Sequence, residues 1–224
     1  MIHPAVRDLF QSLARSQPFR QLVRFLATRE SGRVRLSGLT PTVKSLYTAL
    51  LWHALEQPVL VITASQAAAE DWIEALDTFH SILHAGAPAP APVLIPAWDA
   101  LPGQGLSPHN EIKEQRATAL CRLAAGRASI VVAPVESALQ RLRRPADYLQ
   151  LAVTLRKGDE IPMDWLAAHL DSIGYQRREP VEMEGEYSIR GGIFDVFPAE
   201  ASRPVRIEFF GDTIESLRRF DPET

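Results

Sequence analysis

One segment of the chain has residue types that could bind phosphate, GLTPTVKS at residues 38–45. The phosphate-binding loop of nucleotide hydrolases has the pattern GxxxxGK[ST], and Gly38, Lys44 and Ser45 occupy its first, seventh and eighth positions. The sixth position, normally glycine, is Val43. The loop holds phosphate with consecutive backbone N–H groups in conformations that glycine adopts freely, and a β-branched side chain resists positive φ and fills the anion's space. The segment therefore departs from a working phosphate loop at the position where the loop most needs glycine.

The same segment also fits an ordinary helix start. Pro41 lacks the N–H that a phosphate cradle would use, and it suits the first position of a helix. Thr40 is a residue type that caps helix N-termini, and an apolar-periodic segment follows it. From these residues alone, a lost phosphate loop and a plain helix start both remain open.

No other group of residues predicts a catalytic or metal site. His80 and His84 have the i, i+4 spacing that can place two metal ligands on one helix face, but they lack the glutamate of an HExxH motif, so we expect surface histidines. The single cysteine, Cys121, cannot form an internal disulfide and lies in an amphipathic pattern where it packs as a small apolar side chain. No strand ends in an acidic pair that would hold Mg²⁺ for ATP hydrolysis. We expect no catalytic residue, metal or cofactor.

The composition and the charge distribution favour a protein partner. The 224 residues are 46% hydrophobic, enough for a real core, and no apolar run is long enough to span a membrane. Arg7 and Asp8 lie where a signal peptide would be apolar, so we expect a cytoplasmic chain. Residues 1–150 hold 15 Lys/Arg against 12 Asp/Glu, whereas residues 151–224 hold 9 against 15. The second part is thus too acidic for a typical DNA-binding module.

The first 146 residues predict N-terminal helices followed by an α/β domain. Residues 1–30 show helical periodicity broken near Pro18, and their arginines form either a solvated face or a nucleic-acid contact. Residues 31–146 alternate strands and helices, and continuous apolar strands favour a parallel sheet covered on both faces. The expected strands are 33–38, 58–63, 93–97 and 129–134, and the expected helices are 41–56, 65–79, 110–125 and 135–142. The outer arginines of the first helices are Arg7, Arg15, Arg20, Arg24 and Arg29.

Residues 147–220 predict a small α+β domain with an antiparallel sheet. The expected elements are strands at 151–156, 186–190, 192–197, 204–210 and 213–220 and a helix at 162–172. Alternation in VRIEFF places Val205, Ile207 and Phe209 on one face, and Arg206, Glu208 and Phe210 on the other.

Two long motifs in this second part carry a family resemblance. GEYSIRGGIFDVFP (185–198) and VRIEFFGDTIESLRRFD (205–221) resemble the second domain of the transcription-repair coupling factors, the Mfd family, which is related to the UvrB protein of nucleotide excision repair. PAWDALPGQGLSPHNEI (96–112) and VVAPVESALQRL (131–142) also resemble this family. The stretch ALPGQGLSPHNE lacks the aromatic residues of the DNA-clamping hairpin of UvrB, which favours the coupling factors.

The resemblance implies a fold and a binding function. The first domain would be a UvrB-like, RecA/helicase-like domain with a decayed Walker A loop, in which Gly38, Lys44 and Ser45 survive. The second domain would bind UvrA, and the family's contact residues fall on Arg190, Arg206 and Phe210. Two arginines offer bidentate hydrogen bonds to carboxylates, and a phenylalanine offers an apolar anchor.

The resemblance also implies that this chain corresponds to only a part of a family member. Family members are longer ATP-dependent DNA translocases. Their downstream domains bind ATP, Mg²⁺, RNA polymerase and double-stranded DNA. We therefore expect an N-terminal fragment without catalysis, in which residues 221–224 begin the return to the first domain and the first sheet has an unpaired edge. The alternative is a UvrB-like nucleotide-binding excision-repair ATPase fragment.

Overall fold

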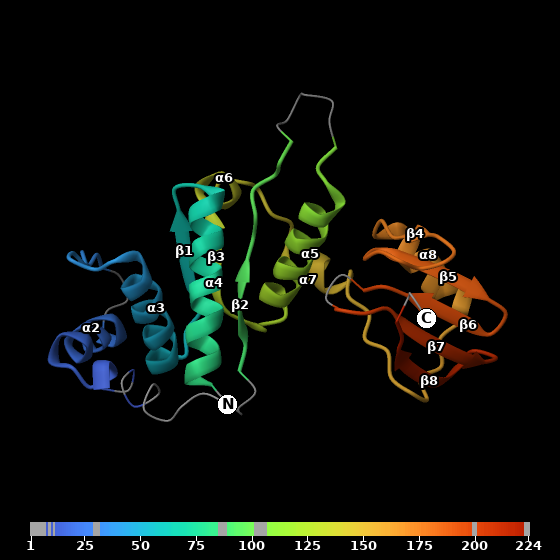
Figure 1. The fold of residues 1–224 in the computed structure, drawn as a ribbon, viewed down its shortest axis with the longest axis horizontal. Helices are drawn as coiled ribbons and strands as arrows, with labels where there is room; N and C mark the ends of the chain where they lie inside the picture. Colours follow the sequence, from blue (N-terminus) through green and yellow to red (C-terminus); the bar gives the residue numbers. More distant parts are fainter. Residues whose placement is uncertain are drawn as a thin grey trace. The chain divides into compact units, whose positions relative to one another are not determined.

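The computed structural model divides the chain into two compact units, Met1–Pro145 and Ala146–Thr224 (Figure 1). It describes residues 8, 10, 12–28, 32–84, 89–100, 107–198 and 201–221. No helix in these ranges is both long and apolar enough to cross a membrane. Each unit has its own sheet and its own core, so the two are described separately.

The first unit is built on a three-stranded parallel sheet. Its strands lie in the order β1-β3-β2, so the last strand in sequence occupies the centre. All seven residues of the central strand are buried, which is why its sequence is apolar throughout. The predicted α/β class with a parallel sheet is confirmed. The strands are β1 (Val59–Thr63), β2 (Ala91–Leu94) and β3 (Ala128–Pro134).

Helices cover this sheet and begin where capping chemistry places them. α4 (Gln66–Leu83) starts after Ser65, whose Oγ accepts a hydrogen bond from the Ala68 N–H at 3.3 Å. α3 (Pro41–Leu55) packs beside α4 (Figure 1). The core between the helices and the sheet includes Leu50, Leu76 and Ile130. The remaining helices are α5 (Asn110–Ala124) and α6 (Val135–Ala138), with α7 (Pro145–Leu149) at the boundary between the units.

The N-terminal segment packs on the first unit. Phe19 of α2 (Gln17–Thr28) is 2% exposed and meets Tyr47 of α3 edge to face, with ring centroids 5.5 Å apart. Phe10 makes a similar contact with Phe79 of α4 at 5.5 Å. The outer arginines 15, 20 and 24 are exposed as predicted, whereas Arg7 and Arg29 lie outside the described residues.

β1 and β2 are the two outer strands of the first sheet, and β1 has an exposed apolar face. Among the described residues, β1 pairs with β3 alone. Val59 and Val61 pack against the core, whereas Leu60 and Ile62 on the other face are 59% and 57% exposed. In the described part of the chain, β1 therefore has an unpaired edge and an exposed apolar face.

The second unit has a five-stranded sheet in the order β4-β5-β6-β7-β8. The last four strands form an antiparallel meander as predicted, while the two-residue strand β4 adds parallel to β5 and makes the sheet mixed. α8 (Met163–Ser172) closes the core, in which Phe194 is completely buried. The strands are β4 (Gln176–Arg177), β5 (Glu186–Arg190), β6 (Ile193–Val196), β7 (Val205–Phe210) and β8 (Thr213–Arg219).

Two expected strands do not form. Residues 33–38 run as an irregular segment in which Val34 and Leu36 are 41% and 46% exposed, and no strand in the described part of the chain pairs with them. Residues 151–156 are also irregular, and the carboxylate of Asp159 accepts the Arg156 N–H at 2.7 Å. Alternating composition predicted both strands wrongly, because a strand also needs a neighbour to pair with.

Candidate functional site

The segment GLTPTVKS forms a capped helix start. Gly38 has φ +77°, and the Thr40 side chain accepts a hydrogen bond from the Val43 N–H at 3.4 Å. The Lys44 N–H donates to the Thr40 carbonyl at 3.0 Å. Ser45 is 2% exposed and its hydroxyl donates to the Pro41 carbonyl at 3.3 Å. The Val43 and Lys44 N–H groups and the Ser45 hydroxyl, which a phosphate loop would offer to a ligand, therefore have partners inside the chain.

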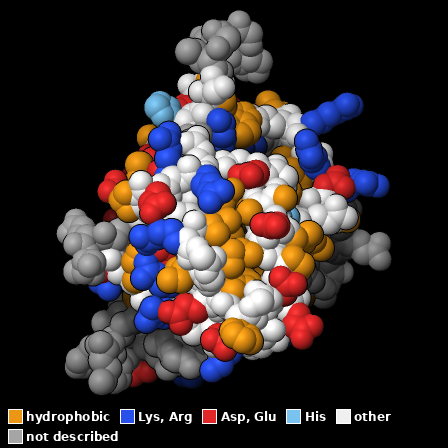
Figure 2. Space-filling model, turned by 90° about the vertical axis from the view of Figure 1, so that its right-hand side faces the viewer, with side chains coloured by type: hydrophobic (Ala, Val, Ile, Leu, Met, Phe, Trp, Pro, Cys, Tyr) orange, Lys and Arg blue, Asp and Glu red, His pale blue; other side chains and the backbone are white. Residues whose placement is uncertain are grey.

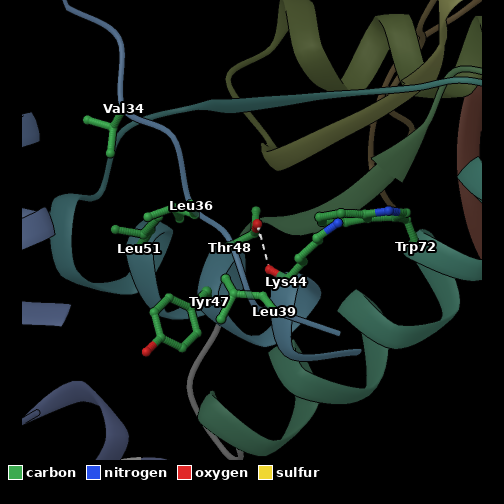
Figure 3. A pocket seen from close by; sticks show the side chains of 8 residues that line it. All are labelled: Val34, Leu36, Leu39, Lys44, Tyr47, Thr48, Leu51 and Trp72. Carbon is green, nitrogen blue, oxygen red and sulfur yellow. Dashed lines mark hydrogen bonds between the residues drawn. The ribbon is translucent and has the colours of Figure 1, made fainter. Parts of the chain in front are cut away.

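A pocket of about 290 Å³ lies beside this helix start (Figure 3). Its lining is largely apolar, and Lys44 is its one cationic side chain, extending toward Trp72. Such a lining suits an apolar group better than a triphosphate, which needs several cationic or N–H donors. The other lining residues are Val34, Leu36, Leu39, Tyr47, Thr48 and Leu51.

The predicted histidine pair lies in a cluster of aromatic rings. His80 and His84 have ring centroids 4.4 Å apart, and Nδ1 of His53 lies 3.1 Å from Nε2 of His84. Both histidines of the pair are partly exposed, and burial lowers the pKa of each below its usual value. Within the described residues, no group of three or more His, Cys, Asp or Glu side chains is arranged to hold a metal ion.

The predicted site residues of the second unit lie on the face of the sheet opposite its core. Val205, Ile207 and Phe209 belong to the core, so the alternation predicted for β7 is confirmed. Arg206 and Phe210 therefore share the outer face, four residues apart, which corresponds to roughly 13 Å along an extended strand. Figure 2 looks onto this unit and shows acidic and basic side chains interspersed with hydrophobic ones.

Arg206 is held by a buried carboxylate. Asp195 lies directly opposite Arg206 in the β6–β7 pairing and is only 3% exposed. Nε and Nη2 of Arg206 reach its two carboxylate oxygens at 2.7 Å each, a bidentate ion pair. The hydrogen bond to Asp195 raises the pKa of Arg206, and the Phe220 ring lies 4.7 Å from the guanidinium carbon.

Arg190 approaches the same carboxylate more loosely. Its Nη2 lies 3.5 Å from Oδ2 of Asp195, and its Nη1 lies 3.6 Å from Oε1 of Glu179. The Arg190 side chain is 53% exposed. The structure thus brings the two predicted arginines together at one carboxylate, with Arg206 held tightly and Arg190 held weakly.

Phe210 projects from the end of β7. It is 76% exposed, although a phenylalanine in a strand is normally buried. It pairs with Thr213 across a two-residue turn, and the β7–β8 register shifts just before it, between Glu208 and Phe209. A large aromatic side chain is therefore fixed by the backbone but left uncovered in this chain.

The glycines of the RGG motif shape the hairpin that carries Arg190. Gly191 has φ +59°, which a two-residue turn between paired Arg190 and Ile193 requires. Gly192 has a different constraint, because a Cβ there would lie 2.9 Å from the Phe209 carbonyl oxygen. The Phe209 N–H donates to the Gly192 carbonyl at 2.8 Å, so β7 approaches the turn closely.

Sequence reasoning missed Asp195 and the ion pair of Glu208, although alternation along β7 placed Glu208 on this face. Asp195 interrupts the apolar strand GIFDVF, and its place opposite Arg206 follows from the register of the hairpin. Glu208 forms a second ion pair with Arg218, 2.6 Å from Nη2, and also accepts from the Ser216 hydroxyl at 2.7 Å. Pairing the charges across predicted strands would have found both ion pairs.

The sequence of the second unit matches a known class of domain. Residues 153–224 match the family model described as the UvrB interaction domain. The match contains the outer-face residues of β5 to β8, so this sheet carries the sequence pattern of that class.

Similarity to whole proteins gives the same result and confirms the predicted resemblance. The chain is 40% identical to the transcription-repair-coupling factor of Haemophilus influenzae over 58% of its length, and 35% identical to that of Myxococcus xanthus over 93%. It is also 37% identical to UvrABC system protein B of Cupriavidus pinatubonensis over 58% of its length. The chain covers 11%, 17% and 19% of these three relatives, respectively, so it spans less than a fifth of each.

Proposed function

We propose that this chain is a UvrA-recruiting module of transcription-coupled nucleotide excision repair, acting in the cytoplasm. The match of residues 153–224 to the UvrB interaction domain and the similarity to transcription-repair-coupling factors support this proposal. The observation that carries it is the 76% exposure of Phe210 on the same sheet face as a pair of arginines. An uncovered aromatic side chain on the same face as arginines is a composition typical of protein interfaces.

In this proposal the outer face of the sheet meets an acidic and partly apolar surface of UvrA. Phe210 enters an apolar pocket of the partner, and burying a phenylalanine side chain is worth about 2–3 kcal/mol. Arginine on the same face gives orientation through hydrogen bonds to carboxylates. The β-sheet backbone fixes the spacing of these groups before binding, which reduces the entropy lost on association.

We further propose that the chain has no catalytic activity and binds no nucleotide. The helix-start N–H groups of Val43 and Lys44 are hydrogen-bonded within the chain, and the neighbouring pocket is largely apolar, which supports this view. ATP, Mg²⁺, RNA polymerase and double-stranded DNA would act through regions of the longer relatives that this chain does not span.

The test is direct binding of UvrA to the full chain, measured by calorimetry. Phe210→Ala should weaken the complex by about thirty-fold or more, the loss of at least 2 kcal/mol typical of a hot-spot aromatic. Trp165→Ala is a matched control, because Trp165 is 50% exposed but lies on α8, which covers the opposite face of the sheet. Absence of a complex, or equal losses for the two variants, would refute the proposal.

A second candidate is a nucleotide-binding module of the UvrB type. The similarity to UvrABC system protein B and the retained Gly38, Lys44 and Ser45 favour it. It requires measurable ATP affinity that falls in a Lys44→Ala variant. Calorimetry that detects no binding at millimolar ATP would eliminate it.

A further inference from the structure

Arg190 and Arg206 on the outer face of the sheet have different surroundings, and the buried carboxylate of Asp195 is the cause. We propose that Asp195 is a positioning residue that fixes Arg206 on the sheet and leaves Arg190 as the arginine that receives a carboxylate of the partner. This inference rests on the proposed UvrA-binding function and divides the roles within that site.

Arg206 has little capacity left for a partner. Its Nε and Nη2 already donate to both oxygens of Asp195 at 2.7 Å, and the Phe220 ring covers one face of the guanidinium at 4.7 Å. Its side chain is 24% exposed. The fork of donors that would give a bidentate contact with a partner carboxylate is thus used inside the chain.

Arg190 is in the opposite situation. Its distances of 3.5 Å to Asp195 and 3.6 Å to Glu179 are long, and its own side chain and that of Glu179 are 53% and 58% exposed. Exposed ion pairs of this kind contribute little stability. A partner carboxylate can therefore replace Glu179 at Arg190 with little loss.

Asp195 couples the two arginines because it lies between like charges. Without its carboxylate, the two guanidinium groups would repel each other, and Arg206 would lose both of its short hydrogen bonds. A long side chain released in this way regains rotamer freedom that binding must then remove. Asp195 itself, 3% exposed, has no surface to offer a partner and acts only through the arginines.

The test uses the affinity of the full chain for UvrA at several salt concentrations. Asp195→Asn should weaken binding about ten-fold or more, because Asn keeps the shape but not the charge-assisted pair. Arg206→Lys should have a similar effect, since an ammonium group cannot form the bidentate contact. Arg190→Gln should weaken binding and also reduce its salt dependence, as expected for the residue that meets the partner's charge.

Two comparisons separate positioning from a general loss of structure. Phe194→Leu changes the adjacent core position, whose side chain faces away from the arginines, and should leave affinity within about two-fold while hydrogen exchange reports a folded sheet. In an Arg206→Gln background, Asp195→Asn should lower the affinity for UvrA by no more than about two-fold, because the arginine that Asp195 positions is already absent.

The outcomes separate this inference from the function on which it rests. If the unmodified chain fails to bind UvrA, the proposed function and the role of Asp195 both fall. If the unmodified chain binds UvrA, three results would each show that the positioning role alone is wrong. The Asp195→Asn variant could bind as tightly as the unmodified chain, or no more weakly than Phe194→Leu. Alternatively, Asp195→Asn could weaken binding as much in the Arg206→Gln background as in the unmodified chain.

Discussion

Replacing Gly192 with alanine should destabilise the sheet of the second unit through a single contact. The added Cβ would lie 2.9 Å from the Phe209 carbonyl oxygen, closer than such atoms normally approach. The oxygen belongs to the backbone and the backbone also fixes the position of the Cβ, so neither atom can turn away, and the Phe209 N–H to Gly192 carbonyl hydrogen bond of 2.8 Å holds the strands at this separation. Relief therefore requires β7 to move away from the turn.

The size of the effect follows from two opposing terms. Overpacking costs about 1–3 kcal/mol, while the lower backbone entropy of an unfolded alanine returns about 0.4–1 kcal/mol. The net loss should be about 1–2 kcal/mol, which lowers the protection of the β6 and β7 amides from hydrogen exchange by about 5–30-fold. Hydrogen exchange of the full chain is the appropriate assay, because it reports on this sheet separately from the first unit.

Asparagine distinguishes steric conflict from backbone strain at the two glycines. Gly191 has φ +59° and open space around its Cβ position, so Gly191→Asn should be tolerated better than Gly191→Ala. At Gly192 asparagine should be no better than alanine, because the conflict is with the Cβ itself. Protection unchanged in Gly192→Ala, or restored in Gly192→Asn, would show the reasoning to be wrong.

Three further changes test other parts of the chain by denaturation or hydrogen exchange. Thr40→Ala removes the cap of α3 and should lower its local stability by about 1 kcal/mol, whereas Thr40→Ser should not. Tyr187→Phe removes the 2.8 Å hydrogen bond to Asp171 and should lower the free energy of unfolding by about 0.5–1.5 kcal/mol. An unchanged free energy of unfolding would show that this hydrogen bond does not stabilise the second unit. Burial lowers the pKa of His80 and His84, so the unfolded chain binds protons at a higher pH than the folded chain does. The free energy of unfolding should therefore fall as the pH drops from about 7 through the unfolded pKa near 6.5. The His80→Phe variant should show a smaller fall over the same pH range.

Much of the first unit could be predicted because local signals agreed with tertiary packing. Thr40 and Ser65 marked the starts of α3 and α4, and the apolar run at Ala128–Pro134 became the fully buried central strand. The pattern at residues 33–38 failed, since alternation describes a half-buried surface but not the presence of a neighbouring edge. β4 could not be predicted, because two residues carry no periodicity.

The candidate site shows a similar division. The face shared by Arg206 and Phe210 followed from alternation along one strand, whereas the choice of those residues came from family resemblance. The buried carboxylate between the arginines required the pairing of β6 with β7, which single-strand patterns do not contain. Which side chains bind a partner stays a prediction, because exposure of Phe210 gives an opportunity for contact and no identity for the partner.

The strand orders of the two sheets have different consequences during synthesis. In the first unit β1 and β2 both pair with β3, so neither strand has its sheet partner until Pro134 has left the ribosome. In the second unit β5 to β8 each pair with the strand made just before, and the sheet can grow as the chain lengthens. Nonlocal parallel pairing is also slower than a meander. A nascent chain that ends before β3 therefore contains two apolar strands without their sheet partner. These strands are prone to aggregate until β3 has been synthesised, so this is the stage at which a chaperone would be most useful.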